Sequence, residues 1–208
     1  MIVYAAFVKG QMNLYRKLAN RSSEGQALLE NNRDKLPTDW SPDGRFLLFT
    51  QSDSNEAGDL WVLPVASDGK PFPLTETHFD EQSARFSPNS QWIAYSSDES
   101  GKREIYVRRF PGPGERKQIS SGGGVAPRWS QDGHHIYYQN PDWKLMEISV
   151  TTGSALQQGI PRLRFSVPVD SDYEVFADGK FLVNEQVGNL DGPQIVLLNW
   201  QTELGLKK

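Results

Sequence analysis

A serine beside three glycines is the first candidate for chemistry in this sequence. Ser121 precedes the glycines in the segment SSGGG (120–124). A serine hydrolase of the α/β type carries its nucleophile in a G-x-S-x-G turn, with an acid and a histidine later in the chain. The sequence contains no such turn. Consecutive glycines indicate a connection that needs permissive backbone angles, so we expect a loop and no catalytic serine.

The three histidines could bind a metal ion or transfer protons. His134 and His135 are neighbours in an expected strand, where successive side chains point to opposite faces, so they cannot converge on one ion. His78 stands alone in the segment ETHFDEQS, and the chain contains no cysteine. We therefore expect no metal site and no cofactor.

An acidic loop offers the oxygen ligands that calcium prefers. Residues 53–59 read DSNEAGD, but this loop lacks the spacing and the terminal bidentate glutamate of a calcium site. The equivalent loop in the next unit, DESGKRE (98–104), carries basic residues. We therefore interpret both loops as hairpins between strands.

Six tryptophans raise the question of sugar stacking. Four aromatic residues, Trp40, Phe86, Trp129 and Phe176, are assigned to the same place at the end of a strand, so we expect them in the core. Trp143 lies in a short hairpin instead, and the sequence leaves open whether it is exposed.

Composition excludes several classes of partner. The chain of 208 residues has 22 basic and 26 acidic side chains and a net charge of −4, so we expect no nucleic acid. Its apolar runs have the length of strands, which predicts no contact of this segment with a membrane. The start, MIVYAAFVKG, lacks a basic leader and predicts a strand in place of a signal peptide.

A repeat positions all of these residues. Four segments place a tight turn after an aromatic residue: WSPDG, FSPNS, WSQDG and VFADG. Their turn residues, Asp43, Asn89, Asp132 and Asp178, are 46, 43 and 46 positions apart. A second β-rich segment follows each turn: DLWVLPV (59–65), EIYVRRF (104–110), KLMEISV (144–150) and QIVLLNW (194–200). A period of roughly 40–50 residues is typical of a propeller.

Each repeat predicts four short antiparallel strands. The second strand is apolar at successive positions, as in residues 46–49 (FLLF) and 92–95 (WIAY). This is the pattern of a sheet that is covered on both faces. The predicted fold class is therefore all-β: a β-propeller of four-stranded antiparallel blades, partial or open, with about 4.5 blades present.

The expected organisation is a single domain over 1–208. The blades are expected at approximately 1–31, 32–76, 77–120, 121–166 and 167–208. The first unit lacks an innermost strand, which favours the C-terminal part of a longer propeller. A small closed ring and an oligomer that joins the two ends are the alternatives.

The repeat resembles the TolB-type, WD-like propeller repeat of bacterial periplasmic and cell-surface proteins, over nearly the whole chain. The segments TDWSPDGRFLLFT, FSPNSQWIAYSS, GGGVAPRWSQDG and IVLLNW are most similar to the propeller sensor regions that follow acidobacterial serine/threonine kinases. The resemblance implies an extracytoplasmic location, a partner-binding role and tethering to a kinase domain in a longer protein. The chain itself contains no kinase motif.

We predict a non-catalytic binding or scaffold module that recognises a protein or peptide partner, or a small ligand, through the loops at one end of the propeller. The candidate residues lie in loops and have mixed polarity: Arg33, Asp34, His78, Asp80, Glu81, Glu99, Arg103 and Trp143.

Two alternatives stay open. One is an enzymatic context, either the accessory propeller of a prolyl-oligopeptidase-like peptidase or a metal-dependent hydrolase at the central channel. The innermost strands bring Asp39, Arg85, Arg128 and Glu174 to that channel, which indicates salt bridges in place of a metal cage. The other alternative is a remnant gene product that binds nothing specific.

Overall fold

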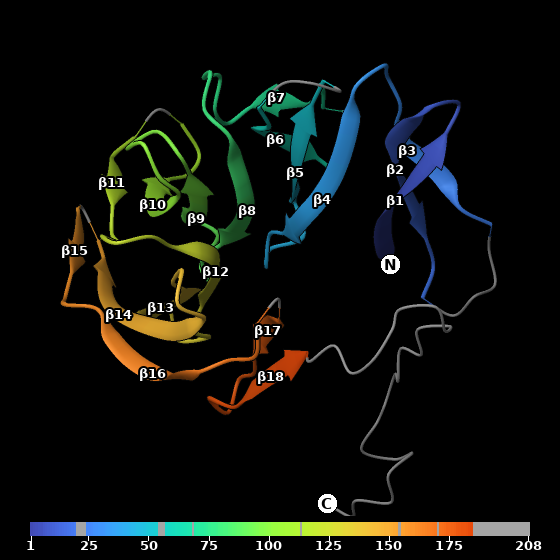
Figure 1. Cartoon of the computed structure of the whole chain (residues 1–208). Helices are drawn as coiled ribbons and strands as arrows, with labels where there is room; N and C mark the ends of the chain where they lie inside the picture. Colours follow the sequence, from blue (N-terminus) through green and yellow to red (C-terminus); the bar gives the residue numbers. More distant parts are fainter. Residues whose placement is uncertain are drawn as a thin grey trace, which may run out of the picture.

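The computed structural model describes residues 1–19, 24–53, 57–67, 69–112, 114–153, 155–169 and 171–184. Within these residues every regular element is a β-strand, and the strands pair antiparallel in five sheets. Figure 1 shows the sheets as blades fanned around a common centre. The predicted fold class, a partial all-β propeller, is confirmed.

The first three blades follow the order of the chain. Blade 1 has three strands: β1 (Ile2–Val8), β2 (Gln11–Lys17) and β3 (Gln26–Leu29). Blade 2 has four: β4 (Asp34–Trp40), β5 (Phe46–Ser52), β6 (Asp59–Pro64) and β7 (Phe72–Pro73). Blade 3 also has four: β8 (Glu81–Phe86), β9 (Trp92–Ser97), β10 (Glu104–Arg109) and β11 (Arg116–Gln118).

The last two blades are less regular. Blade 4 comprises β12 (Val125–Trp129), β13 (His135–Gln139), β14 (Lys144–Thr152), β15 (Leu156–Gln158) and β16 (Arg162–Ser166). Its long strand β14 pairs with both β15 and β16, so two short strands share the outermost place. Blade 5 is described for β17 (Asp172–Val175) and β18 (Phe181–Asn184). The strand expected at 194–200 lies outside the described residues.

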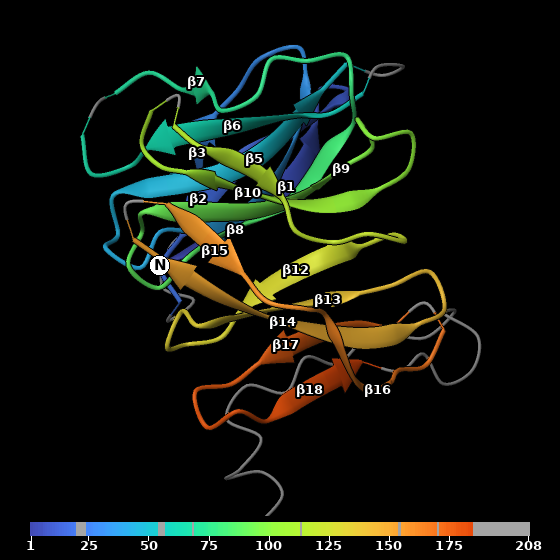
Figure 2. The ribbon, with the colours of Figure 1, turned by 90° about the vertical axis from the view of Figure 1, so that its left-hand side faces the viewer.

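The strands β4, β8, β12 and β17 lie nearest the centre of the fan (Figure 1). Viewed from the side, the sheets of successive blades lie against one another (Figure 2). Blades 2, 3 and 4 therefore each offer one face to the blade before and the other to the blade after.

Side chains of one strand serve two different cores. In β9, Trp92 and Ala94 are buried in a cluster with blade 4, whereas Ile93 and Tyr95 are buried in a cluster with blade 2. Strand β5 repeats this pattern between blades 1 and 3. Full burial of one such large side chain contributes about 1.5–3 kcal/mol, which explains the unbroken apolar runs in the sequence.

A hydrogen-bonded turn joins the first and second strands of blades 2, 3 and 4. In blade 3, Ser87 Oγ donates to Asn89 Oδ1 (2.7 Å) and accepts from Trp92 N (2.9 Å). Ser41 and Ser130 make the equivalent bonds in blades 2 and 4. The serine and the aspartate or asparagine two residues later therefore stabilise the turn in each of these blades.

The turn of blade 5 corrects one expectation, because Phe176 is 43% exposed. Its amide donates to Lys180 O and its carbonyl accepts from Gly179 N, as the backbone of Ser41 does with its own turn. Phe176 thus stands in the place of the serine, and Val175, which packs on the cluster of blades 4 and 5, takes the place of the aromatic residue. The other three aromatic residues pack in the core as expected: Trp40, Phe86 and Trp129.

The first prediction concerns this turn. Replacing Ser87 with alanine is expected to lower the free energy of unfolding by about 1–3 kcal/mol, because the buried Trp92 amide loses an acceptor. Urea unfolding followed by tryptophan fluorescence measures the change. Pro88→Ala, in the same turn, is the control, and an equal effect of both substitutions would contradict the role given to the serine hydroxyl.

Candidate functional site

The inner strands place a row of charged side chains in the middle of the propeller. The row contains Asp39 in β4, Arg85 in β8, Arg128 in β12 and Glu174 in β17. Asp39 Oδ1 lies 3.7 Å from an Arg85 NH group, and Arg128 Nε lies 3.2 Å from Glu174 Oε2. The predicted salt-bridged channel is confirmed for these two pairs.

Arg128 is the more fully bonded of the two arginines. It donates to Glu174 (3.2 Å), to Asp172 Oδ1 (3.2 Å) and to Pro127 O (3.0 Å). Its guanidinium also lies 5.3 Å from the centre of the Tyr173 ring. All three nitrogens of this guanidinium are therefore engaged by the protein.

Arg85 is less well satisfied. Its Nε is buried and has no hydrogen-bond partner among the described residues, and its ion pair with Asp39 is long. Burial lowers the pKa of Arg85, and the charge of Arg128 adds to this effect. Burial likewise raises the pKa of Asp39, against the effect of Arg85. The Arg85 guanidinium thus keeps donor capacity that the described residues do not use.

Hydrogen bonds between inner strands follow the period of the repeat. Asp39 Oδ2 accepts from Phe86 N (2.8 Å), and Trp129 Nε1 donates to Arg85 O (3.1 Å). The partners are 47 and 44 residues apart, which is one repeat. These bonds fix the spacing of the inner strands and hence the shape of the channel.

The inner strands of blades 2, 3 and 4 each contain a break in register. In β8 the break lies between Gln82 and Arg85, where Ser83 has φ = 57°. Strand β12 has the same feature at Ala126, with φ = 51°, and β4 has a third break. A β-bulge redirects the side chains that follow it, so these breaks determine how the arginines enter the channel.

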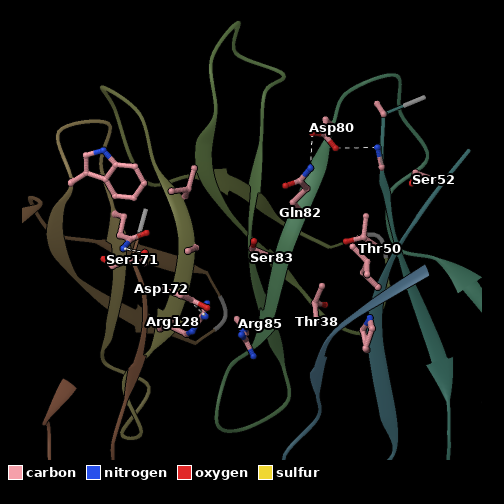
Figure 3. Close-up of a pocket in the computed structure, with 18 residues that line it drawn as sticks. Thr38, Thr50, Ser52, Asp80, Gln82, Ser83, Arg85, Arg128, Ser171 and Asp172 are labelled. Atoms are coloured by element: carbon pink, nitrogen blue, oxygen red, sulfur yellow. Dashed lines mark hydrogen bonds and ion pairs between the residues drawn. The ribbon is translucent and has the colours of Figure 1, made fainter. Parts of the chain in front are cut away.

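A cavity of about 930 Å³ lies at one end of the channel. Its wall combines the inner strands of blades 2 to 5 with hairpin residues of blades 2 and 4. Figure 3 shows Asp80 and Gln82 toward one end of this cavity and Arg85 and Arg128 toward the other. Uncharged polar side chains are frequent in the wall: Thr38, Thr50, Ser52, Gln82, Ser83 and Ser171.

Strained backbone and unpartnered polar atoms gather at this cavity. Three of the five non-glycine residues with positive φ in the described chain line it: Ser83, Ala126 and Trp143. Three of the six buried side-chain atoms that lack a hydrogen-bond partner among the described residues belong to its lining: Thr38 Oγ1, Arg85 Nε and Ser171 Oγ. Both features are enriched at functional sites.

A second cavity, of about 440 Å³, lies toward the turns between the first and second strands. Pro42 and Pro88 of those turns line it, together with Arg85 and Arg128. The two cavities share the arginines. The charged row therefore separates two openings of one channel.

Three of the predicted site residues meet at the larger cavity. Asp80 and Trp143 line it, and Arg103 forms an ion pair with Asp80. Asp80 also accepts from Gly58 N (3.0 Å) and from Gln82 Nε2 (2.8 Å). Burial alone would raise the pKa of Asp80, but the hydrogen bonds from Arg103, Gly58 and Gln82 outweigh it, so that the pKa is lowered.

The other predicted residues do not line this cavity, and their part in binding stays a prediction. Arg33 forms an ion pair with Asp53 (3.2 Å), and Asp34 accepts a hydrogen bond from the backbone amide of Met12 in β2 (2.7 Å). The His78 ring lies beside the Phe79 ring, with 4.0 Å between the ring centres. Glu99 forms a hydrogen-bonded ion pair with Arg116 (2.8 Å), and Glu81 lies in the interior.

Glu81 corrects the expectation of an accessible loop residue, because its side chain is fully buried. It accepts from Thr77 Oγ1 (2.8 Å), and burial raises its pKa. Sequence reasoning also missed Glu104, a buried carboxylate that accepts from the amides of Gly122 and Gly123 (2.9 Å each). Both glycines have positive φ, so the segment SSGGG is a loop, as expected, and Glu104 fixes it.

The described residues contain no group of three or more His, Asp or Glu side chains arranged to hold a metal ion. A helix long and apolar enough to cross a membrane is likewise absent from that part of the chain.

The second prediction concerns Asp80. Asp80→Asn is expected to lower the free energy of unfolding at neutral pH by about 1–3 kcal/mol, since a hydrogen bond between charged groups is lost. Because folding lowers the pKa of Asp80, its contribution is present above the ordinary aspartate pKa of about 3.9 and disappears as the pH falls through the lower, folded value.

Urea unfolding at pH 3 to 7 measures this effect, and the gap between the two proteins should narrow below about pH 4. Asp142→Asn, at an exposed residue with a long ion pair (3.5 Å) to Lys144, is the control. A gap that stays constant down to pH 3 would contradict the assignment.

Neither a family model nor a curated protein matches this sequence, but solved structures share its fold. A protein assigned as TolB from Agrobacterium tumefaciens has a TM-score of 0.64 at 17% identity, over 87% of this chain and 68% of that one. A protein assigned as a 6-phosphogluconolactonase from Bacteroides uniformis has a TM-score of 0.55 at 16% identity, over 87% of this chain and 59% of that one.

A third structure is a puromycin-hydrolysing peptidase from Mycobacterium tuberculosis, with a TM-score of 0.57 at 16% identity, over 82% of this chain and 31% of that one. The chain thus spans little more than half of the lactonase and less than a third of the peptidase. At such identities the likeness concerns the fold alone: this chain has the β-propeller fold that a TolB-type protein shares with enzymes of different activities.

Proposed function

We propose that this protein is a non-catalytic binding module whose ligand enters the larger cavity at the mouth of the central channel. The observation that carries the proposal is the coincidence, in one wall, of three strained backbone positions and three unpartnered buried polar atoms. Unpartnered buried groups and non-glycine residues in the left-handed conformation each cost free energy, so their concentration at one cavity favours a role there.

The chemistry of the channel supports binding more than hydrolysis. The carboxylates of Asp39 and Glu174 face arginines, and paired carboxylates are poor metal ligands because the guanidinium competes for the same oxygens. A metal-dependent hydrolase is therefore the weaker candidate. The accessory propeller of a peptidase is the second candidate, and the fold shared with the mycobacterial peptidase favours it.

The proposal extends to the kind of ligand, the location of the protein and its tethering to a kinase domain. The ligand is a protein, a peptide or a small molecule, as expected from loops on a rigid scaffold. Tethering to a kinase domain and an extracytoplasmic location follow from the resemblance of the repeats to sensor propellers. The net charge of −4 disfavours nucleic acid.

The third prediction tests the position of the site. Gln82 is exposed and lines the larger cavity, whereas Gln131 is exposed and lines the smaller one. Gln82→Trp places a bulky side chain at the larger cavity and should abolish ligand binding. Gln131→Trp does the same at the smaller cavity and should leave ligand binding intact. Ligand-observed NMR with a panel of peptides, sugars and small organic acids provides the measurement.

Circular dichroism verifies that both variants fold. If Gln82→Trp weakens the binding of no compound in the panel, the proposed function is contradicted. Binding that is sensitive only to Gln131→Trp would place the site at the other opening.

A further inference from the structure

Arg85 is the less fully bonded of the two arginines that line the larger cavity. Arg128 is engaged at all three nitrogens, and Asp80 accepts three hydrogen bonds. Arg85 has a buried Nε without a partner and an ion pair of 3.7 Å to Asp39. The Arg85 side chain is 28% exposed, so a ligand carboxylate in the cavity can reach the end of the guanidinium and bind it in a two-point contact.

The charge around Arg85 limits the charge of that ligand. Asp39 and Asp172 lie in or beside the charged row, and Asp172 also lines the cavity. These carboxylates repel additional negative charge. A single carboxylate is therefore favoured over a phosphate, which carries close to two negative charges at neutral pH.

The other polar side chains of the cavity wall are suited to hydrogen bonds with hydroxyl groups of a ligand. Hydroxyl and amide side chains both donate and accept hydrogen bonds, and the wall presents them from two strands, at Thr50 in β5 and at Gln82 and Ser83 in β8. Thr38 and Ser171, which also line the cavity, add hydroxyls that have no protein partner among the described residues. A ligand with several hydroxyl groups satisfies such a wall.

Trp143 supplies an aromatic wall. It is half-buried and has φ = 56°, a conformation that costs a residue with a Cβ about 1–2 kcal/mol. Asn140 fixes the hairpin by accepting from Asp142 N (3.1 Å), Lys144 N (2.9 Å) and Trp143 N (3.1 Å). Glycine would fit this backbone without strain. Trp143 packs against the hydrophobic cluster of blades 4 and 5, and the electron-rich face of an indole also attracts the polarised C–H groups of a sugar ring.

We propose that the larger cavity binds a sugar acid, a hydroxylated monocarboxylate such as a uronic acid, with the carboxylate on Arg85, the hydroxyls on the polar wall and the ring against Trp143. This inference rests on the proposed binding function and names its ligand class. The free acid and a uronate unit of a polysaccharide share this chemistry.

The fourth prediction is tested by isothermal titration calorimetry on the full chain. The probes are D-glucuronate, D-galacturonate and a galacturonate trimer, with methyl glucoside and acetate as compounds that lack the carboxylate or the hydroxyls. The sugar acids should bind at least about tenfold more tightly than either control compound, since a hydrogen-bonded charge contributes in that range. Monomer binding indicates the free acid, and binding of the trimer alone indicates a polysaccharide.

The variants test the residues. Arg85→Met should weaken sugar-acid binding at least about tenfold, and Arg85→Lys, which keeps the charge and loses the fork, should weaken it as well. Trp143→Leu should weaken it while preserving an apolar side chain. Arg45→Met, which removes an exposed arginine outside the cavity, is the matched control. If Arg85→Met fails to fold, Arg85→Lys carries the test.

Failure has two distinguishable forms. Sugar acids that do not bind, or that bind equally well to the Arg85 variants, overturn the inference. If other compounds of the panel still bind in a manner sensitive to Gln82→Trp, the binding function stands and the ligand class is wrong. A peptide among those compounds would point to a peptide as the occupant.

Discussion

A β-sheet that is apolar on both faces is stable in water only when a neighbour covers each face, and this constraint organises the whole molecule. Strand β9 sends Trp92 into one interface and Tyr95 into the other, so removing either neighbouring blade exposes large side chains. The blades must therefore repeat at a nearly constant spacing. Hydrogen bonds that join partners 47 and 44 residues apart, from Phe86 to Asp39 and from Trp129 to Arg85, set this spacing at the inner strands.

The same stacking has a consequence at the centre. Inner strands that converge on one axis bring Asp39, Arg85, Arg128 and Glu174 into a narrow space, where unpaired charges would be costly. Three of these groups are well compensated, and Arg85 is not. The bulges that turn the arginines inward also leave strained backbone in the wall of the larger cavity. The part of the molecule that departs most from ideal geometry is thus the part best suited to a ligand.

The sequence predicted the fold because the signals for it are local and repeated. The turn chemistry of Ser87 and Asn89 and the apolar run of β9 recur in several units, and the channel pairs followed from the same alignment. Where a single unit departs from the pattern the prediction failed, as at Phe176, which stands in the place of the turn serine and not of the aromatic residue before it. The cavity could not be foreseen, since its wall combines residues of four blades. Nor could the burial of Glu81, because a glutamate beside a loop is usually exposed.

Successive blades are held together at their inner strands, and the rest of the structure depends on this connection. The indole N–H of Trp129, which donates to Arg85 O of the preceding blade at 3.1 Å, reports on this directly, and its exchange with deuterated water is measurable by ¹H–¹⁵N NMR. If the blades are bonded in this way, the exchange is slow and requires unfolding of the domain. An exchange as fast as that of free tryptophan would show that the blades do not bond in this way.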